Sequence, residues 1–287
     1  MKKILMKQCD LKKIKSLIMK SSSMDNLIFC SVNGSQFEST AYNRNKSALK
    51  SVTADLETMC EVFSNPIDGV VKIQFANANK LINTLTLVGG DSLDIIFEID
   101  ETTNYGYRAI IKNSEMNVTV NCADKEAVDF LEIPENARHS IFEDKSKMQC
   151  ALTISDSEFK KMTGLFGLNK DSVRVFFNLV GDEMVLSEIE STDENVRSLV
   201  NELVNNNDYE GFRKFDKLYD KKLISTEFEK VQDVENYLAC FNKQWFSWID
   251  SGDKSYSIEF HTNKMKVITL DDDGVQSYVV LTPVRFA

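Results

Sequence analysis

Few residues in this chain have the types and spacing that catalysis requires. The sequence contains only two histidines, His139 and His261, so a histidine-based triad or metal cluster has little to draw on. None of the eleven glycines precedes a lysine, which excludes a phosphate-binding loop of the Gly-Lys-Ser/Thr kind, and Gly-x-Gly-x-x-Gly is absent. We therefore expect a protein that is not an enzyme and that uses no cofactor.

The run Asp271-Asp272-Asp273 is the one cluster that could hold a divalent cation. Such a cation needs several oxygen ligands that converge, and three adjacent residues of a hairpin cannot all face one point. Because Gly274 follows, the run is more typical of an exposed turn, and we expect no metal site. An enzyme that uses this cluster is kept as a third, weaker hypothesis.

The cysteines contain no Cys-x-x-Cys spacing, and most lie in or beside apolar segments. They are Cys9, Cys30, Cys60, Cys122, Cys150 and Cys240. This pattern is more typical of buried free thiols than of disulfides or a zinc site.

The composition is that of a globular chain with enough apolar material for two cores, since 43% of its 287 residues are hydrophobic and only three are proline. The apolar run at the start is interrupted by Lys7 and is too short for a signal peptide or a membrane span. We expect a cytoplasmic protein, in the host cytoplasm if it is viral.

The informative chemistry is electrostatic. The whole chain carries a net charge of −10, but residues 1–20 hold seven lysines and one acid, Asp10, which gives this segment +6 and the rest −16. A helix over residues 10–20 would place its apolar residues on one side at about 100° per residue. The lysines on the other side are Lys12, Lys13, Lys15 and Lys20.

Other lysines lie on or beside three further predicted helices: Lys80, Lys160, Lys161 and Lys243. If these helices share one surface, an otherwise acidic protein would present a basic stripe. The stripe would attract a polyanion, and the acidic remainder of the surface would repel it. Contacts with phosphates would be independent of base sequence and sensitive to salt. The alternative is that each lysine belongs to an ordinary solvated helix face.

The elements that would carry these lysines recur four times along the chain. Each unit is an amphipathic helix, a polar loop and short alternating strands. The helices are expected over 10–20, 77–87, 155–166 and 233–241. The strands are expected over 26–32, 36–42, 92–99, 105–112, 115–122, 172–179, 182–189, 255–261, 264–270 and 276–282. Asn33-Gly34 is a strong hairpin signal between the first two strands.

Four such units predict two similar domains, because one helix and one hairpin cannot bury a core alone. We expect the first domain over 1–122, an acidic connector over 123–147 and the second domain over 148–287. An insertion over 191–223 interrupts the second domain, and its part from Glu194 to Val204 has helical period.

Four segments resemble one known family. Leu11-Lys12-Lys13 with Lys20 is similar to the first basic helix of the DNA sliding clamps, and Ser157-Glu158-Phe159-Lys160 resembles the start of the helix in their second domain. Val71–Phe75 through Lys80–Leu85 is similar to a clamp strand and its following helix. Tyr278–Pro283 resembles the last strand. In this order the segments resemble proliferating cell nuclear antigen and the clamps of T-even-type phages, over residues 10–122 and 147–286.

The resemblance implies an α+β DNA clamp fold, in which each of two similar domains packs two helices on antiparallel sheets. Head-to-tail association would close three copies into a homotrimeric ring. The implied function is that of a DNA polymerase processivity factor, which encircles duplex DNA regardless of sequence and tethers replication proteins. The implied partners are double-stranded DNA, a DNA polymerase and a clamp loader, with no membrane.

The resemblance also implies a pocket for short peptide motifs of those partners. It would be bordered by Leu131, Ile133, Val280, Thr282 and Pro283. The chain departs from the pattern in its long acidic connector, its insertion and its fourth helix, where Lys243 is the only basic candidate. Two other hypotheses stay open: a monomeric DNA-binding factor with the same fold, and an acidic viral structural or assembly protein.

Overall fold

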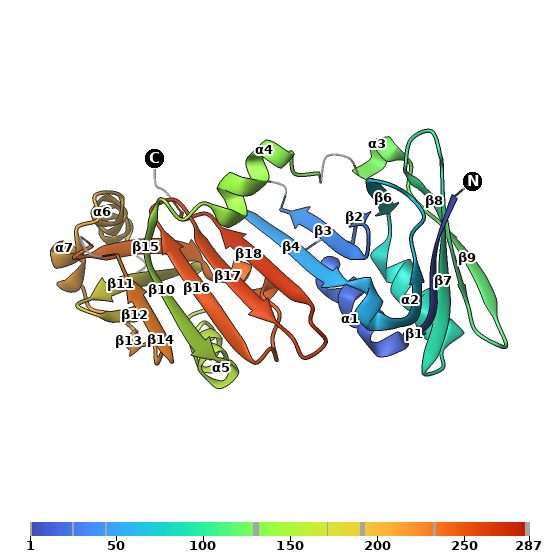
Figure 1. Cartoon of the computed structure of the whole chain (residues 1–287). Coiled ribbons are helices and arrows are strands. Elements are labelled where there is room, and N and C mark those ends of the chain that lie inside the picture. Colours follow the sequence, from blue (N-terminus) through green and yellow to red (C-terminus); the bar gives the residue numbers. More distant parts are fainter. Residues whose placement is uncertain are drawn as a thin grey trace. The chain divides into compact units, whose positions relative to one another are not determined.

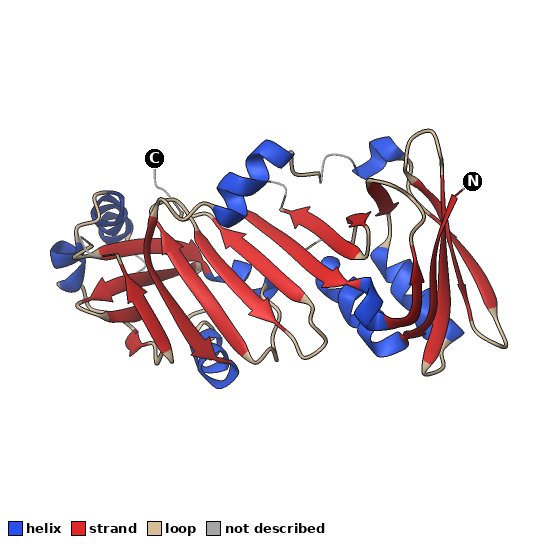
Figure 2. Cartoon of the chain, in the orientation of Figure 1, coloured by secondary structure: helices blue, strands red, loops and turns tan. Residues whose placement is uncertain are grey.

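The structure, a computed structural model, describes residues 2–24, 26–43, 45–128, 132–170, 172–189, 193–231 and 234–284. These residues form antiparallel sheets and short helices, an α+β fold (Figure 2). They divide into two units. Unit 1 comprises Met1–Arg138 with Leu270–Tyr278, and unit 2 comprises His139–Thr269 with Val279–Ala287.

Unit 1 holds two main helices, α1 (Leu11–Ser21) and α2 (Ala78–Val88), which lie side by side (Figure 1). Its five-stranded sheet has the order β5-β1-β7-β8-β9, and a second sheet region has the order β4-β3-β2-β6. The strands are β1 (Lys2–Asp10), β2 (Ile28–Asn33), β3 (Gln36–Tyr42), β4 (Ala48–Asp55), β5 (Cys60–Ser64), β6 (Val70–Phe75), β7 (Ser92–Ile99), β8 (Gly106–Lys112) and β9 (Asn117–Asn121). A 3-10 turn, η1 (Leu56–Met59), precedes β5.

The core of unit 1 lies between the helices and both sheet regions. Ile14 and Leu17 of α1 and Leu85 of α2 pack in one apolar cluster with residues of both sheet regions, such as Ile95 and Ile73. Because the apolar residues of each helix face this cluster, the lysines of both helices are left on the opposite side.

Unit 2 contains the four-stranded sheet β13-β12-β11-β15 and a second sheet region of order β14-β10-β16-β17. The strands are β10 (Met148–Ser155), β11 (Arg174–Val180), β12 (Glu183–Glu188), β13 (Tyr219–Lys222), β14 (Glu227–Lys230), β15 (Tyr237–Asn242), β16 (Ser255–His261), β17 (Met265–Leu270) and β18 (Gln276–Leu281). The helices are α5 (Asp156–Leu165), α6 (Glu194–Asn205), α7 (Tyr209–Arg213) and the 3-10 helix η4 (Lys243–Trp248). None of the helices in the described ranges is long and apolar enough to cross a membrane.

The two halves of the chain repeat one order of elements. A strand and a helix are followed by five strands, a helix and three strands, from β1 to β9 and again from β10 to β18. Between them the chain forms the short turns α3 (Lys125–Val128), α4 (Glu135–Arg138) and the π-helical η3 (His139–Glu143). Helices α6 and α7 lie between β12 and β13, whereas the described residues between the corresponding strands β3 and β4 contain no helix.

Helices α6 and α7 cover one face of the four-stranded sheet (Figure 1). Val200 and Val204 of α6 and Phe212 of α7 form an apolar cluster with Phe176 of β11 and Leu238 of β15. Strand β11 is therefore buried on both faces. The added helices give unit 2 a second hydrophobic layer.

The helix predicted over 233–241 is wrong. Residues 237–241 of this span belong to β15, and the short helix η4 follows the strand at Lys243. Tyr237–Phe241 are all buried, because β15 packs against the core on one face and against α6 on the other. A run that is apolar on both faces has no period of two, so its pattern does not distinguish a buried strand from a helix.

Two smaller predictions also differ from the structure. The first hairpin turns at Gly34-Ser35, with Gly34 at φ +59°, one residue later than Asn33-Gly34. Cys9 of β1 lies opposite Cys60 of β5, and the two form a disulfide. The prediction of free thiols is thus wrong for this pair, since the strand register that joins them is not visible in their spacing. It is confirmed for Cys30, Cys122, Cys150 and Cys240.

Candidate functional site

Helix α1 begins at an aspartate that orders its basic first turn. The Asp10 carboxylate accepts hydrogen bonds from the backbone N–H groups of Lys12 and Lys13, at 2.8 and 3.1 Å. A side-chain cap of this kind satisfies donors that the first turn leaves unpaired. With Ile14 and Leu17 buried, Lys12 is exposed, and Lys13, Lys15 and Lys20 are partly exposed.

Helix α2 adds a lysine beside α1. Asn77 caps it by accepting a hydrogen bond from the backbone N–H of Lys80 at 2.9 Å. Neither helix contains an acidic residue, and the Lys80 side chain is exposed. We call Lys12, Lys13, Lys15, Lys20 and Lys80 the α1–α2 lysine set. Unit 1 therefore carries five positive charges on two neighbouring helices.

The turn after β17 neutralises part of this set. Lys20 Nζ lies 2.9 Å from an oxygen of Asp271, and Lys13 Nζ lies 3.5 Å from an oxygen of Asp273. Asp271 also accepts hydrogen bonds from the backbone of Asp273 and Val275. The prediction of an exposed turn is thus wrong for Asp271 and Asp273, which are partly buried, and right for Asp272.

The helix of unit 2 that corresponds to α1 has no net charge. In α5, Lys160 Nζ is 2.5 Å from the Asp156 carboxylate, and Glu158 is buried. Lys221 and the backbone N–H of Ile224 bind the Glu158 carboxylate, and they hold its pKa below the usual range although burial raises it. Lys161 is exposed. The two predicted lysines of α5 thus lie beside acids of the same helix.

Lys243 is not available to a ligand on the surface, so its prediction as a DNA contact is not supported. Its side chain is buried, and Nζ lies 3.1 Å from the Glu188 carboxylate and donates to the carbonyl of Asn169. Glu188 is fully buried and also accepts a hydrogen bond from the Tyr219 hydroxyl at 3.2 Å. Lys243 is therefore the counter-ion of a buried carboxylate.

A groove with a volume of about 380 Å³ lies in unit 2 at the segment after β18. It is lined by Pro283 and Val284, by Tyr237–Ala239 of β15, by Gln149 and Thr262, and by Val204, Asn205 and Asn207 of the α6–α7 segment. Asn207 Oδ1 accepts a hydrogen bond from the backbone N–H of Leu238 at 2.8 Å, and the N–H of Val284 donates to the carbonyl of Cys240 at 2.8 Å. These two bonds occupy backbone groups of β15.

No family model matches the sequence, and no curated protein matches it either. Solved structures match nearly all of it, among them these three. The A. fulgidus proliferating cell nuclear antigen (PCNA), solved with the C-terminal region of FEN-1, has a TM-score of 0.67 at 13% identity, with 100% of both chains covered. The Thermococcus kodakaraensis PCNA has a TM-score of 0.66 at 10% identity, with 98% and 100% covered. The PCNA2–PCNA3 complex of Sulfolobus tokodaii has a TM-score of 0.62 at 10% identity, with 97% and 98% covered.

The chain has the fold of the sliding clamps. This confirms the predicted α+β clamp fold, in which two similar halves pack helices on antiparallel sheets. Because the two halves of the chain repeat one order of elements, α1 and α2 of the first half correspond to α5 and η4 of the second.

The predicted site residues of this clamp fold are only partly brought together. Lys12, Lys13, Lys15, Lys20 and Lys80 share two adjacent helices, whereas Lys160 and Lys161 belong to the other unit. Pro283 lines the groove, Thr282 is exposed and Val280 is buried. Ile133 is buried in unit 1, and Leu131 lies outside the described residues.

Sequence reasoning missed the groove residues of the α6–α7 segment. The helical period of 194–204 was visible, but nothing in the pattern places Val204 and Asn207 beside the segment after β18. That placement depends on the apolar contact of α6 with β15, whose strand was itself hidden by its apolar run.

Proposed function

We propose that this protein is a sliding clamp, a processivity factor that encircles duplex DNA and tethers replication proteins to it. The observation that carries the proposal is the α1–α2 lysine set on the solvent side of two neighbouring helices that contain no acid. The protein carries a net charge of −10, so this basic region would orient it toward a polyanion. Lysines that contact only phosphates allow the bound protein to move along the duplex.

Ring closure is supported by two strands that end their sheets. In the described residues, β9 pairs with β8 along one edge, and β13 pairs with β12 along one edge. Each presents a row of backbone donors and acceptors that another chain can complete. We propose that β9 of one copy pairs with β13 of the next, which makes a head-to-tail contact that closes into a homotrimer.

We propose that the groove beside Pro283 receives short peptide motifs of partners such as a DNA polymerase or a clamp loader. The groove combines apolar side chains with amides, which suits an extended peptide. The A. fulgidus PCNA was solved with the C-terminal region of FEN-1 bound, so that peptide is a suitable probe. This role requires no catalysis or membrane, and we expect the protein to act in the cytoplasm, or in the host cytoplasm if it is viral.

The DNA-binding part of the proposal is tested with a short duplex of random sequence at several salt concentrations. Changing Lys12, Lys15 and Lys80 together to Ser should weaken binding and lower the slope of log K against log salt by about one unit for each phosphate that is no longer neutralised. Lys7→Ser is the matched control, because Lys7 is exposed on β1 rather than on either helix. Unchanged binding by the triple variant would remove this surface from the proposal.

The monomeric alternative is favoured by one observation: α1 and α2 of unit 1 contain lysines and no acid, whereas α5 of unit 2 has no net charge. A monomer could hold DNA on that open face. Light scattering separates the two, since the chain has a mass of 32.7 kDa and a trimer would have about three times that mass.

A further inference from the structure

Strands β16 and β17 of unit 2 carry a buried polar row. Glu259 and His261 lie two residues apart on β16 and therefore project from the same face. Lys266 of β17 is the cross-strand partner of Glu259. Glu259, His261 and Lys266 are exposed by only 4%, 0% and 3%, so something covers this polar face.

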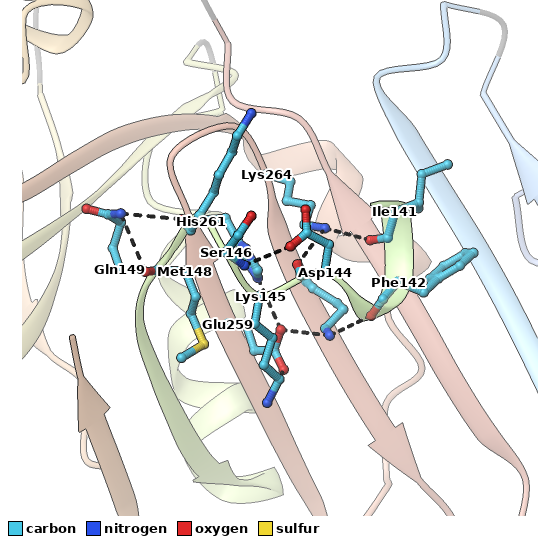
Figure 3. A network of polar contacts seen from close by, with 12 residues as sticks. Ile141, Phe142, Asp144, Lys145, Ser146, Met148, Gln149, Glu259, His261 and Lys264 are labelled. Carbon is cyan, nitrogen blue, oxygen red and sulfur yellow. Dashed lines mark hydrogen bonds and ion pairs between the residues drawn. The ribbon is translucent and has the colours of Figure 1, made fainter. Parts of the chain in front are cut away.

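The end of the connector covers it. Lys264, in the turn between the two strands, donates from Nζ to the carbonyls of Ser140 and Ile141, both at 2.8 Å, and reaches that of Asp144 at 3.5 Å. Figure 3 shows Lys264 beside Ile141. Lys266 Nζ donates to the carbonyl of Phe142 at 2.8 Å. Both lysines thus bind the backbone of η3 and the residues after it, and neither interaction depends on a connector side chain.

The charge of Glu259 explains how Lys264 and Lys266 can both be buried beneath the end of the connector. Glu259 is their counter-ion, with an oxygen 2.7 Å from Lys266 Nζ and 3.1 Å from His261 Nε2. Lys145 of the connector adds a cation 3.5 Å from the other oxygen. Burial lowers the pKa of Lys264, and the nearby Lys266 lowers it further. Carbonyl oxygens at the end of a helical turn carry partial negative charge and favour cations.

We propose that Lys264 and Lys266 are positioning residues that hold the end of the interdomain connector by its backbone carbonyls. Within η3, the side chains of His139 and Glu143 are exposed and pair with each other at 2.8 Å, whereas Lys264 and Lys266 bind backbone carbonyls of this segment. The functional consequence rests on the proposed clamp function: Lys147, the last residue of the connector, accepts hydrogen bonds from Thr262 and Gln149, which line the proposed peptide groove. Fixing its end would limit the conformations that a peptide must select.

Hydrogen exchange of the full chain tests the anchor. In Lys264→Met, amides of residues 139–146 should exchange at least about tenfold faster, because this variant removes hydrogen bonds from a charged donor. Protection of β10 and β16 should not change. Lys170→Met, an exposed lysine of the same unit, and Glu143→Gln, which removes the exposed pair, should leave residues 139–146 as protected as in the wild type. Unchanged exchange of 139–146 in Lys264→Met would overturn the proposal.

If Lys264→Met unfolds the whole unit, a second variant tests the proposal instead. Lys264→Gln keeps one amide donor and a long side chain, so the unit should fold, and local acceleration over 139–146 supports the anchor. Wild-type protection of 139–146 in Lys264→Gln would then refute it.

The link to function is measured separately with a labelled peptide from the C-terminal region of FEN-1. The anchor predicts that Lys264→Gln weakens binding about threefold or more, while Lys170→Met binds as the wild type does. If the wild type does not bind this peptide, the proposed peptide role fails, yet the exchange result still decides whether the lysines hold the connector. If peptide affinity is unchanged while exchange accelerates, the anchor stands and its effect on partners is refuted.

Discussion

Lys20 and Asp271 form an ion pair of 2.9 Å, although one belongs to the first helix and the other to a turn near the end of the sequence. Their side chains are only 11% and 14% exposed. Together with the pair of Lys13 and Asp273, this ion pair lowers the net positive charge around α1. The acidic turn therefore limits how strongly the α1–α2 lysine set can attract a polyanion.

Asp273→Asn should strengthen DNA binding. The carboxylate of Asp273 pairs with Lys13, whereas the turn itself is held by the carboxylate of Asp271. Removing one negative charge beside the lysines should raise affinity for a random duplex about twofold at low salt, and high salt should abolish the gain. Asp68→Asn, an exposed acid of the same unit, is the control. Equal gains in both variants would show that only net charge matters.

The two units should contribute unequally to DNA binding. Lys160 already lies 2.5 Å from Asp156, and α5 has no net charge, so Lys160→Ser should change affinity less than Lys12→Ser does. The comparison uses the same duplex titration for both variants. An equal or larger effect of Lys160→Ser would mean that the lysines of α1 have no special role.

Lys243→Met should destabilise unit 2 without altering the DNA-binding surface. It leaves the fully buried Glu188 without its counter-ion, a change of the kind that costs about 3 kcal/mol. Chemical denaturation should show the lower free energy of unfolding, and the folded variant should bind DNA as the wild type does. If the variant is stable but binds DNA more weakly, Lys243 would be a DNA contact and not the counter-ion of a buried carboxylate.

Glu259 should make stability depend on pH in the acid range. Its pKa is lowered to about 2 from 4.5, because hydrogen bonds from His261 and Lys266 and the charges of Lys266 and Lys145 outweigh the effect of burial, which raises it. The folded state therefore binds this proton less readily than the unfolded state. The resulting stabilisation, about 3 kcal/mol, is complete above pH 4.5 and disappears as the pH falls toward 2.

The check is denaturation of the wild type and of Glu259→Gln across that range. The difference in unfolding free energy between them should shrink as the pH falls from 4.5 toward 2. A constant difference would show that the carboxylate does not act through its charge.

The sequence predicted those elements that have one apolar and one polar side. The lysines of α1 stand opposite Ile14 and Leu17, and β3 and β16 have the predicted bounds. The prediction failed where contacts between segments distant in the sequence determine the structure. β15 is apolar on both faces because α6 covers it, and the disulfide of Cys9 and Cys60 depends on the register of β1 and β5.

The candidate site was predictable to the same extent. Lysine on an acid-free helix is visible in the sequence, so Lys12 and Lys80 are placed as expected. Burial of Lys243 against Glu188 could not be foreseen, since the partner lies 55 residues away on strand β12. Nor could the backbone contacts of Lys264, because the carbonyls it binds leave no mark in the sequence.

The proposal that this chain encircles DNA as a ring is tested most directly by images of single particles at micromolar concentration. We expect closed rings of three copies around a central channel, with β9 of each copy against β13 of the next. Particles that are all single chains of 32.7 kDa under the same conditions would contradict it.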